Sequence, residues 1–236
     1  MTRVANNLAL PLLMLLPAAL AGCYTERIRS EIGHDLVNRD ALLSLSQVVL
    51  VEFERDEDCP ELGQDLTEAI ANSLQEKRLF HVEVVRRDDP RLAALNLEQR
   101  NVFTFKQLAQ ARQAFGSNAL LIGSISRFRS YPRMRASLDL RLLDLRTGRL
   151  IWGVDNTWDT TEKQIEDRMG EFYKHRLKPG YEPAGPRLVQ MSPKMFMKFV
   201  AFEAVETLPS RAEILEQQAE EREREREQAR RAAARR

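Results

Sequence analysis

Arginine offers the clearest chemistry in this sequence, because several arginines gather around one short turn. The segment from Arg127 to Arg135 reads RFRSYPRMR, and Tyr131-Pro132 is where we expect the chain to turn. Because side chains alternate along a strand, such a hairpin would place four arginines on one face, with Arg141 continuing the row: Arg127, Arg129, Arg133 and Arg135. Guanidinium groups bind carboxylates and phosphates through paired hydrogen bonds. These arginines and Tyr131 are the candidate partner-binding residues; the alternative is a solvated sheet face paired with Asp139 and Asp144.

Residues suited to catalysis or metal binding are sparse. The three histidines, His34, His81 and His175, are far apart in the sequence. The sequence contains no H-E-x-x-H, C-x-x-C, G-x-S-x-G or glycine-rich phosphate-loop motif. The acidic segment 52–61 could hold calcium through carboxylate oxygens, but it lacks the EF-hand pattern, so we expect a solvated loop. We therefore predict a protein that is not an enzyme and that binds no cofactor or metal ion.

The N-terminus has the pattern of a secretory signal. Arg3 is followed by an uncharged stretch that lasts until Glu26 and contains the apolar run of residues 8–20. This run holds two prolines and is short for a membrane span of about 20 residues. Leu20 to Cys23, LAGC, resembles the lipobox of bacterial lipoproteins, whose cysteine receives a diacylglycerol before the signal peptide is cleaved. We predict a signal peptide over residues 1–22 and a lipid anchor on Cys23; the alternative is an uncleaved signal anchor.

The predicted anchor assigns the protein to a cell envelope. Acyl chains contribute about 0.8 kcal/mol per buried CH₂, so a lipoprotein is held firmly at the membrane. Tyr24 follows the cysteine where retention signals carry aspartate, which resembles sorting to the outer membrane in envelopes with two membranes. We therefore expect the inner face of the outer membrane, facing the periplasm, and no nucleic-acid partner, since the net charge is only +1. With Cys23 acylated, Cys59 is either free or part of an interchain disulfide.

Apolar periodicity predicts the elements that position the arginine turn. The β-branched runs 47–53 and 81–85 indicate buried strands. Apolar residues at every fourth position between them indicate a helix, namely Leu62, Leu66, Ile70 and Leu74. A second helix should begin at the capping-box pattern of Thr104 and Gln107 and end at Gly116.

Three more strands complete the predicted domain. Residues 118–125 are apolar on both faces, residues 134–142 alternate between apolar and polar, and residues 150–154 close a hairpin. The sequence therefore predicts an α/β fold, an α+β sandwich with a mixed five-stranded sheet in the order strand, helix, strand, helix and three strands. The expected segments are a signal peptide (1–22), a tether (23–46), the domain (47–158), a long loop (159–192), a docked C-terminal helix (193–209) and a charged helical or disordered tail (210–236).

Several of these runs resemble a group of envelope lipoproteins. The segments 48–53 and 119–125, and the strand-turn-strand segment 137–152 that ends in Trp152, are similar to the periplasmic domain of the curli-secretion-channel (CsgG-like) lipoproteins. The same domain plan is similar to that of the lipoprotein activators of penicillin-binding proteins (LpoB-like) and of the N-terminal domain of TolB. The resemblance covers roughly residues 45–158 and implies the α/β sandwich derived above.

The departures from these families shape the functional prediction. Curli channels insert long amphipathic hairpins, but only residues 126–135 separate the third and fourth predicted strands, while a membrane strand needs about 9–11 residues each way. Residues 155–190 are charged and interrupted by prolines, and the tether is shorter than that of the synthase activators. We predict a non-enzymatic, periplasm-facing adaptor or assembly factor that binds a protein partner in envelope assembly, transport or wall maintenance. The alternatives are a homo-oligomeric component of a CsgG-like secretion channel and a module that binds peptidoglycan or anionic lipid.

Overall fold

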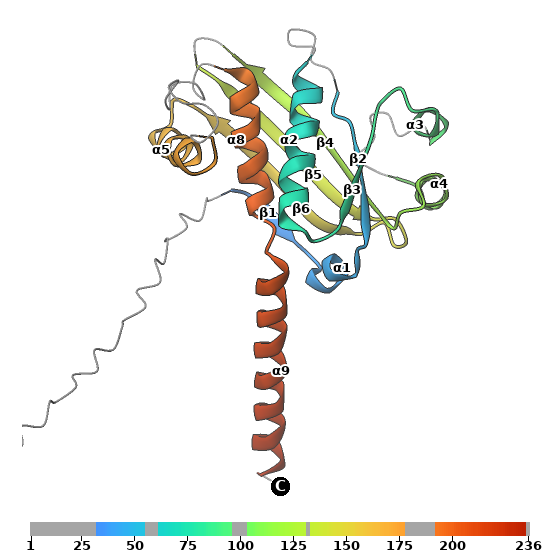
Figure 1. Ribbon diagram of the computed structural model, residues 1–236. Coiled ribbons are helices and arrows are strands. Elements are labelled where there is room, and N and C mark those ends of the chain that lie inside the picture. Colours follow the sequence, from blue (N-terminus) through green and yellow to red (C-terminus); the bar gives the residue numbers. More distant parts are fainter. Residues whose placement is uncertain (1–31, 55–60, 96–102, 131–132, 178–191, 235–236) are drawn as a thin grey trace, which may run out of the picture. The chain divides into compact units, whose positions relative to one another are not determined.

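A mixed β-sheet organises the part of the chain that the computed structural model describes, residues 32–54, 61–95, 103–130, 133–177 and 192–234 (Figure 1). Within these residues the sheet has six strands in the order β1-β6-β5-β4-β2-β3. The strands are β1 (His34–Leu36), β2 (Gln47–Val51), β3 (His81–Val85), β4 (Ala119–Arg129), β5 (Arg135–Asp144) and β6 (Leu150–Asp159). β2 pairs in parallel with both β3 and β4, whereas β4, β5, β6 and β1 form an antiparallel ladder.

The helices lie on the two faces of the sheet and at its ends. They are α1 (Arg39–Ser44), α2 (Leu62–Lys77), α3 (Pro90–Leu95), α4 (Phe105–Phe115), α5 (Lys163–Phe172), the π-helical turn η1 (Tyr173–Leu177), α8 (Pro193–Glu206) and α9 (Arg211–Ala233). The predicted start of α4 is confirmed, because Thr104 and Gln107 form both bonds of a capping box. Its end is also confirmed: Gly116 takes a left-handed conformation with φ 64°, which glycine adopts without a steric penalty. Within the described residues, no helix is both long and apolar enough to cross a membrane.

The two faces of the sheet are covered unequally. On one face α2 and α8 pack side by side (Figure 1), and their apolar side chains join those of all the longer strands in one core. On the other face α3 and α4 cover β2, β3 and the start of β4 through a smaller cluster around Leu108 and Phe115. On this second face the side chains of β5 and β6 are polar and partly exposed, and among the described residues no helix packs on them in an apolar cluster. The alternation predicted for residues 134–142 therefore produces one buried face and one open polar face.

The prediction of five strands is wrong by one. The additional strand, β1, lies inside the segment predicted as a tether, where its three residues pair with Trp152 to Val154 of β6. A three-residue strand is too short to show a period of two, and only its pairing with β6 defines it. The helix α1, capped by the Asn38 side chain on the backbone N–H of Ala41, occupies the same segment.

The prediction of a long loop over residues 159–192 is also wrong for its first half. α5 and η1 occupy Lys163 to Leu177 and bury Ile165, Met169 and Phe172 against the core. These three apolar residues have helical spacing, but the charged residues between them concealed the pattern. Strand β6 extends through Asp159, and α8 ends at Glu206. The predicted sites Cys23, Cys59 and Tyr131 lie outside the described residues.

Candidate functional site

The candidate site is the arginine hairpin, defined as residues 127–135, where β4 ends and β5 begins. Arg129 lies directly opposite Arg135 in the β4–β5 ladder, and Arg135 lies opposite Asp159 of β6. Because directly opposed residues point to the same side of an antiparallel sheet, these three side chains share one face. In β5 the even-numbered side chains from Ala136 to Leu142 are buried, so the odd-numbered ones point to the open face. Arg135 and Arg141 are both odd-numbered and therefore lie on that face. The structure therefore brings Arg129, Arg135 and Arg141 into the predicted row.

A β-bulge removes Arg127 from that simple alternation. Between the pairs Ser126–Ser137 and Arg129–Arg135, β4 contains two residues, Arg127 and Phe128, where β5 contains one. Arg127 has a φ of 54°, a left-handed conformation that residues other than glycine seldom adopt, and Phe128 packs against the main core. Arg127 is exposed at the bulge, and Arg133 is exposed just before β5 begins.

The arginine hairpin is strongly positive. The Nε atom of Arg135 lies 3.7 Å from Oδ2 of Asp159, and no described carboxylate forms an ion pair with Arg127, Arg129 or Arg133. The backbone N–H and the hydroxyl of Thr161 both donate hydrogen bonds to Oδ1 of Asp159, at 2.9 and 2.7 Å. These bonds, helped by the charges of Arg135 and Arg129, hold the pKa of Asp159 below its usual range. Among the described carboxylates, only Asp159 pairs with an arginine of the hairpin, and that arginine is Arg135.

The predicted alternative, a solvated sheet face whose arginines pair with Asp139 and Asp144, is confirmed in part, because Arg141 of the predicted row pairs with Asp139. Asp139 pairs with Arg141, at 3.0 Å between Oδ1 and Nε, and Asp144 pairs with Arg146 at 3.2 Å. Asp144 therefore pairs with an arginine outside the row, and neither aspartate pairs with an arginine of residues 127–135. Sequence reasoning missed Asp159 and Thr161 because they lie beyond the end that it assigned to the last strand, although the D-x-T spacing is typical of such a local turn.

The open face continues away from the hairpin as a row of mixed polar groups. The hydroxyls of Ser137 and Thr157 lie 2.7 Å apart on neighbouring strands. Further along the same strands, Asp139 lies opposite Asp155, and its partner Arg141 follows. The surface next to the arginine hairpin thus offers both donors and acceptors on a rigid sheet.

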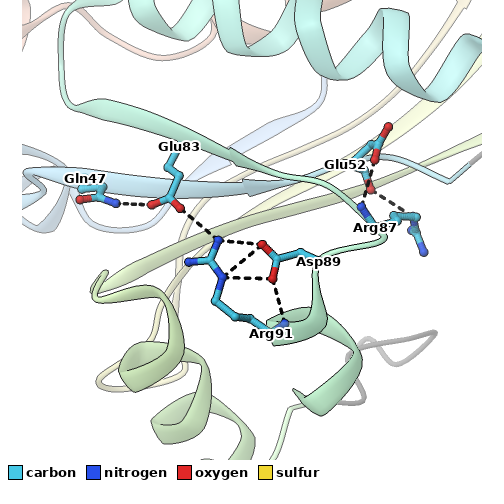
Figure 2. Close-up of polar contacts among 6 residues, drawn as sticks. All are labelled: Gln47, Glu52, Glu83, Arg87, Asp89 and Arg91. Atoms are coloured by element: carbon cyan, nitrogen blue, oxygen red, sulfur yellow. Dashed lines mark hydrogen bonds and ion pairs between the residues drawn. The ribbon is translucent and has the colours of Figure 1, made fainter.

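A second polar cluster lies at the other edge of the sheet (Figure 2). The side-chain amide of Gln47 donates to Glu83 at 2.7 Å, and Nη2 of Arg91 lies 3.4 Å from Glu83 and 2.7 Å from Asp89. The Arg91 guanidinium also lies 5.1 Å from the centre of the Phe115 ring. Because each charge meets a partner inside the cluster, we interpret it as a support that ties the start of α3 to β3 and α4.

The acidic segment predicted as a solvated loop belongs partly to this region. The backbone N–H of Arg87 donates to Oε2 of Glu52 at 3.0 Å (Figure 2). The guanidinium group of Arg87 pairs with the Glu54 carboxylate at 3.2 Å. Residues 55–60 lie outside the described residues. Among the residues that are described, no group of three or more histidine, cysteine, aspartate or glutamate side chains is placed to hold a metal ion.

Sequence reasoning also missed a buried charged group between α5 and α8. Glu203 is the acidic residue inside an otherwise apolar stretch of α8, and its side chain is only 8% exposed. It accepts hydrogen bonds from the Trp158 indole at 3.1 Å and from the Arg168 guanidinium at 2.8 Å. The sequence did contain a sign of this pair, namely a single glutamate within an apolar helix face, since a buried carboxylate needs a partner. All its partners belong to the fold, so we interpret Glu203 as structural.

Comparison with known proteins shows similarity at the level of the fold. No model of a known protein family matches the chain, and no curated protein matches its sequence. The solved structures similar to it include a PelC dodecamer from Paraburkholderia phytofirmans, with 14% identity, a TM-score of 0.43, and coverage of 76% of this chain and 95% of that one. Lipoprotein GNA1162 from Neisseria meningitidis has 13% identity and a TM-score of 0.35, covering 56% of this chain and 99% of that one.

The LpoB C-terminal domain from Salmonella enterica has 18% identity and a TM-score of 0.32, covering 48% of this chain and 82% of that one. The LpoB-like lipoproteins named from the sequence are thus among the structures that this chain resembles.

Proposed function

We propose that this chain is a non-enzymatic envelope lipoprotein that binds an acidic surface of a protein partner through its arginine hairpin. The observation that carries the proposal is the direct opposition of Arg129 and Arg135 across the β4–β5 ladder. Like charges in this position destabilise a sheet, by an amount comparable to the 0.2–1 kcal/mol that a favourable cross-strand pair contributes. The strained φ of Arg127 adds to this unfavourable energy. A carboxylate-bearing partner would relieve the repulsion.

The open face favours a protein partner over a purely anionic polymer. Beside the arginines it presents the Ser137 and Thr157 hydroxyls and the ionised pair of Asp139 and Arg141. A uniformly negative polymer would meet Asp139 and Asp155 unfavourably, whereas a protein surface can place donors opposite these carboxylates. The lipid anchor predicted at Cys23 would hold this face near the envelope and raise its local concentration near a partner.

The proposal is tested by recovery of partners from membranes with the tagged full-length lipoprotein, read by mass spectrometry and native sizing. Arg129→Gln/Arg135→Gln should weaken capture of its envelope partners at least about tenfold, since hydrogen bonds to charged groups contribute about 1.5–3 kcal/mol each. The matched control, Arg112→Gln/Arg149→Gln, removes the same charge from exposed arginines elsewhere and should capture as the parent does. Cys23→Ala should leave the membrane fraction.

Two outcomes would contradict the proposal. Equal capture by the hairpin variant and its control would show that the arginine hairpin is not the binding surface. A large homo-oligomer without any other protein would instead favour the channel alternative.

A further inference from the structure

The open face of the sheet carries acidic side chains as well as the arginines. Asp155 lies directly opposite Asp139 in the β5–β6 ladder. Gly153 lies opposite Arg141 on one side and opposite Asp35 of β1 on the other. Because directly opposed residues point to the same side of an antiparallel sheet, Asp155 and Asp35 share the open face with Arg141. We call Asp35 and Asp155 the β1–β6 acids.

Ion pairs within this face leave its remaining charges at two separate ends. Asp139 pairs with Arg141 at 3.0 Å, and Asp159 lies 3.7 Å from Arg135. Arg129 and the β1–β6 acids are exposed, and no described group of opposite charge forms an ion pair with any of them. After internal pairing, the face is therefore positive at the arginine hairpin and negative where β6 meets β1.

The sheet fixes the distance between the two ends. Asp155 lies four residues from Asp159 along β6, about 14 Å at 3.4 Å per residue. Asp159 lies in one row with Arg129, two strands away at about 4.8 Å per strand. The backbone positions of Arg129 and Asp155 are therefore about 17 Å apart. This distance exceeds the Debye length of about 8 Å at physiological salt, so the two ends do not neutralise each other through solvent.

The fold itself does not account for the negative end. Like charges directly opposite each other destabilise a sheet, and Arg141 compensates only Asp139. Aspartate is also unfavourable in strands, whereas a threonine at position 155 would suit a half-exposed strand. The charge of Asp155 is therefore free for recognition of another molecule.

We propose that the open face binds a protein segment that carries both signs of charge, with its acidic groups on the arginine hairpin and its basic groups on the β1–β6 acids. This inference rests on the proposed function and adds a second half to the same contact. An extended segment spans about 17 Å in about five residues, and a helix in about 11. Attraction at both ends orients the segment, while repulsion at one end disfavours segments of a single sign.

The test measures binding of three fluorescent eight-residue peptides to the full-length lipoprotein in detergent, by anisotropy at low salt. The block peptide has four glutamates followed by four lysines, the mixed peptide alternates the same residues, and the acidic peptide has glutamates only. The centres of the two blocks are about 14 Å apart in an extended chain, which matches the spacing along β6. The parent should bind the block peptide at least about threefold more tightly than the mixed peptide.

The β1–β6 acids should affect two of the peptides in opposite directions. Asp35→Asn/Asp155→Asn should bind the block peptide about three- to tenfold more weakly, since an exposed ion pair contributes up to about fivefold. The same variant should bind the acidic peptide about threefold more tightly, because the repulsion is removed. A general loss of structure would weaken both. The hairpin variant Arg129→Gln/Arg135→Gln should also weaken both.

A matched control separates the position of the acids from the general charge. Asp88→Asn/Glu216→Gln neutralises two exposed acids outside the open face and should bind all three peptides as the parent does.

Two results would overturn the inference alone. One is equal binding of the block and mixed peptides by the parent, and the other is a change in the same direction for both peptides in Asp35→Asn/Asp155→Asn. Peptide binding that does not depend on Arg129 and Arg135 would contradict the proposed function, and this inference with it.

Discussion

Arg127 shows how one backbone angle changes a site that side-chain alternation predicts. Alternation correctly places Arg129, Arg135 and Arg141 on one face, because strands β4 and β5 are regular on both sides of the bulge. It fails for Arg127, because a bulge depends on the pairing of two strands and leaves no period in either sequence alone. Asp159, which holds its charge beside the arginines, was missed for a related reason, since only the ladder places it opposite Arg135.

The left-handed conformation of Arg127 predicts an ordering of stability among variants. Glycine would relieve about 1–2 kcal/mol of strain but lose about 0.4–1 kcal/mol through the more flexible unfolded chain. We therefore expect the free energy of unfolding of Arg127→Gly to equal that of the parent or to exceed it by up to about 1.5 kcal/mol. Arg127→Val should lose about 1–2 kcal/mol, because a β-branched residue fits this conformation poorly. Urea denaturation measures both; a valine variant as stable as the parent would contradict the strained bulge.

At the scale of elements, the sequence predicted helices and strands whose apolar spacing or capping residues lie within the element itself. It did not predict elements that are defined by pairing with another segment. The stripes of α2 and the capping box of α4 are local, and the structure confirms both. β1 exists only through β6, and α5 is a helix whose three buried residues are separated by charged ones. The short strand and the charged helix were therefore assigned to a tether and a loop.

The pair of Arg168 and Glu203, whose side chains are 13% and 8% exposed, joins α5 to α8 beside the ring contacts of Phe172 with Phe199 and Phe202. Removing one partner leaves the other charge buried, so Glu203→Leu and Arg168→Met should each destabilise the protein by about 3 kcal/mol or more. The double variant should lose clearly less than the sum, because it leaves only the Trp158 indole without its acceptor. Chemical denaturation of all four proteins gives the coupling; simple additivity would show that the pair does not hold α5 in place.

At the scale of the whole domain, the described helices cover the two sides of the sheet unequally, and the sequence predicted this asymmetry better than it predicted the number of strands. The apolar positions of residues 134–142 form the face that α2 and α8 cover, and their polar neighbours form the open face. The main core includes two fully buried tryptophans, Trp152 and Trp158, both of which point to the covered side. The open side can therefore carry charges that the fold does not need, and Arg129 and Arg135 of the arginine hairpin lie there.

Stability of the whole domain should depend on pH through aspartates on its sheet and loops. Arg91 lowers the pKa of Asp89 through side-chain and backbone hydrogen bonds, and Thr161 lowers that of Asp159 in the same way. Burial opposes ionisation of Asp144, but the hydrogen bonds and charge of Arg146 outweigh it and lower its pKa as well. Groups with lowered pKa values stabilise the fold fully above their unfolded pKa, about 3.9 for aspartate, and lose this contribution as the pH falls toward their folded values.

The free energy of unfolding should therefore be level between about pH 5 and 7 and should decrease below about pH 4, as the unfolded chain takes up protons first. Urea denaturation across this range measures the slope. Asp159→Asn should be less stable than the parent at neutral pH and should show a shallower decrease in acid, because one of the responsible carboxylates is gone. A decrease in the free energy of unfolding that begins near pH 6 would implicate histidine instead. If Asp159→Asn showed the same pH dependence as the parent below pH 4, the bonds from Thr161 and the charges of the arginine hairpin would not be what keeps the Asp159 carboxylate ionised.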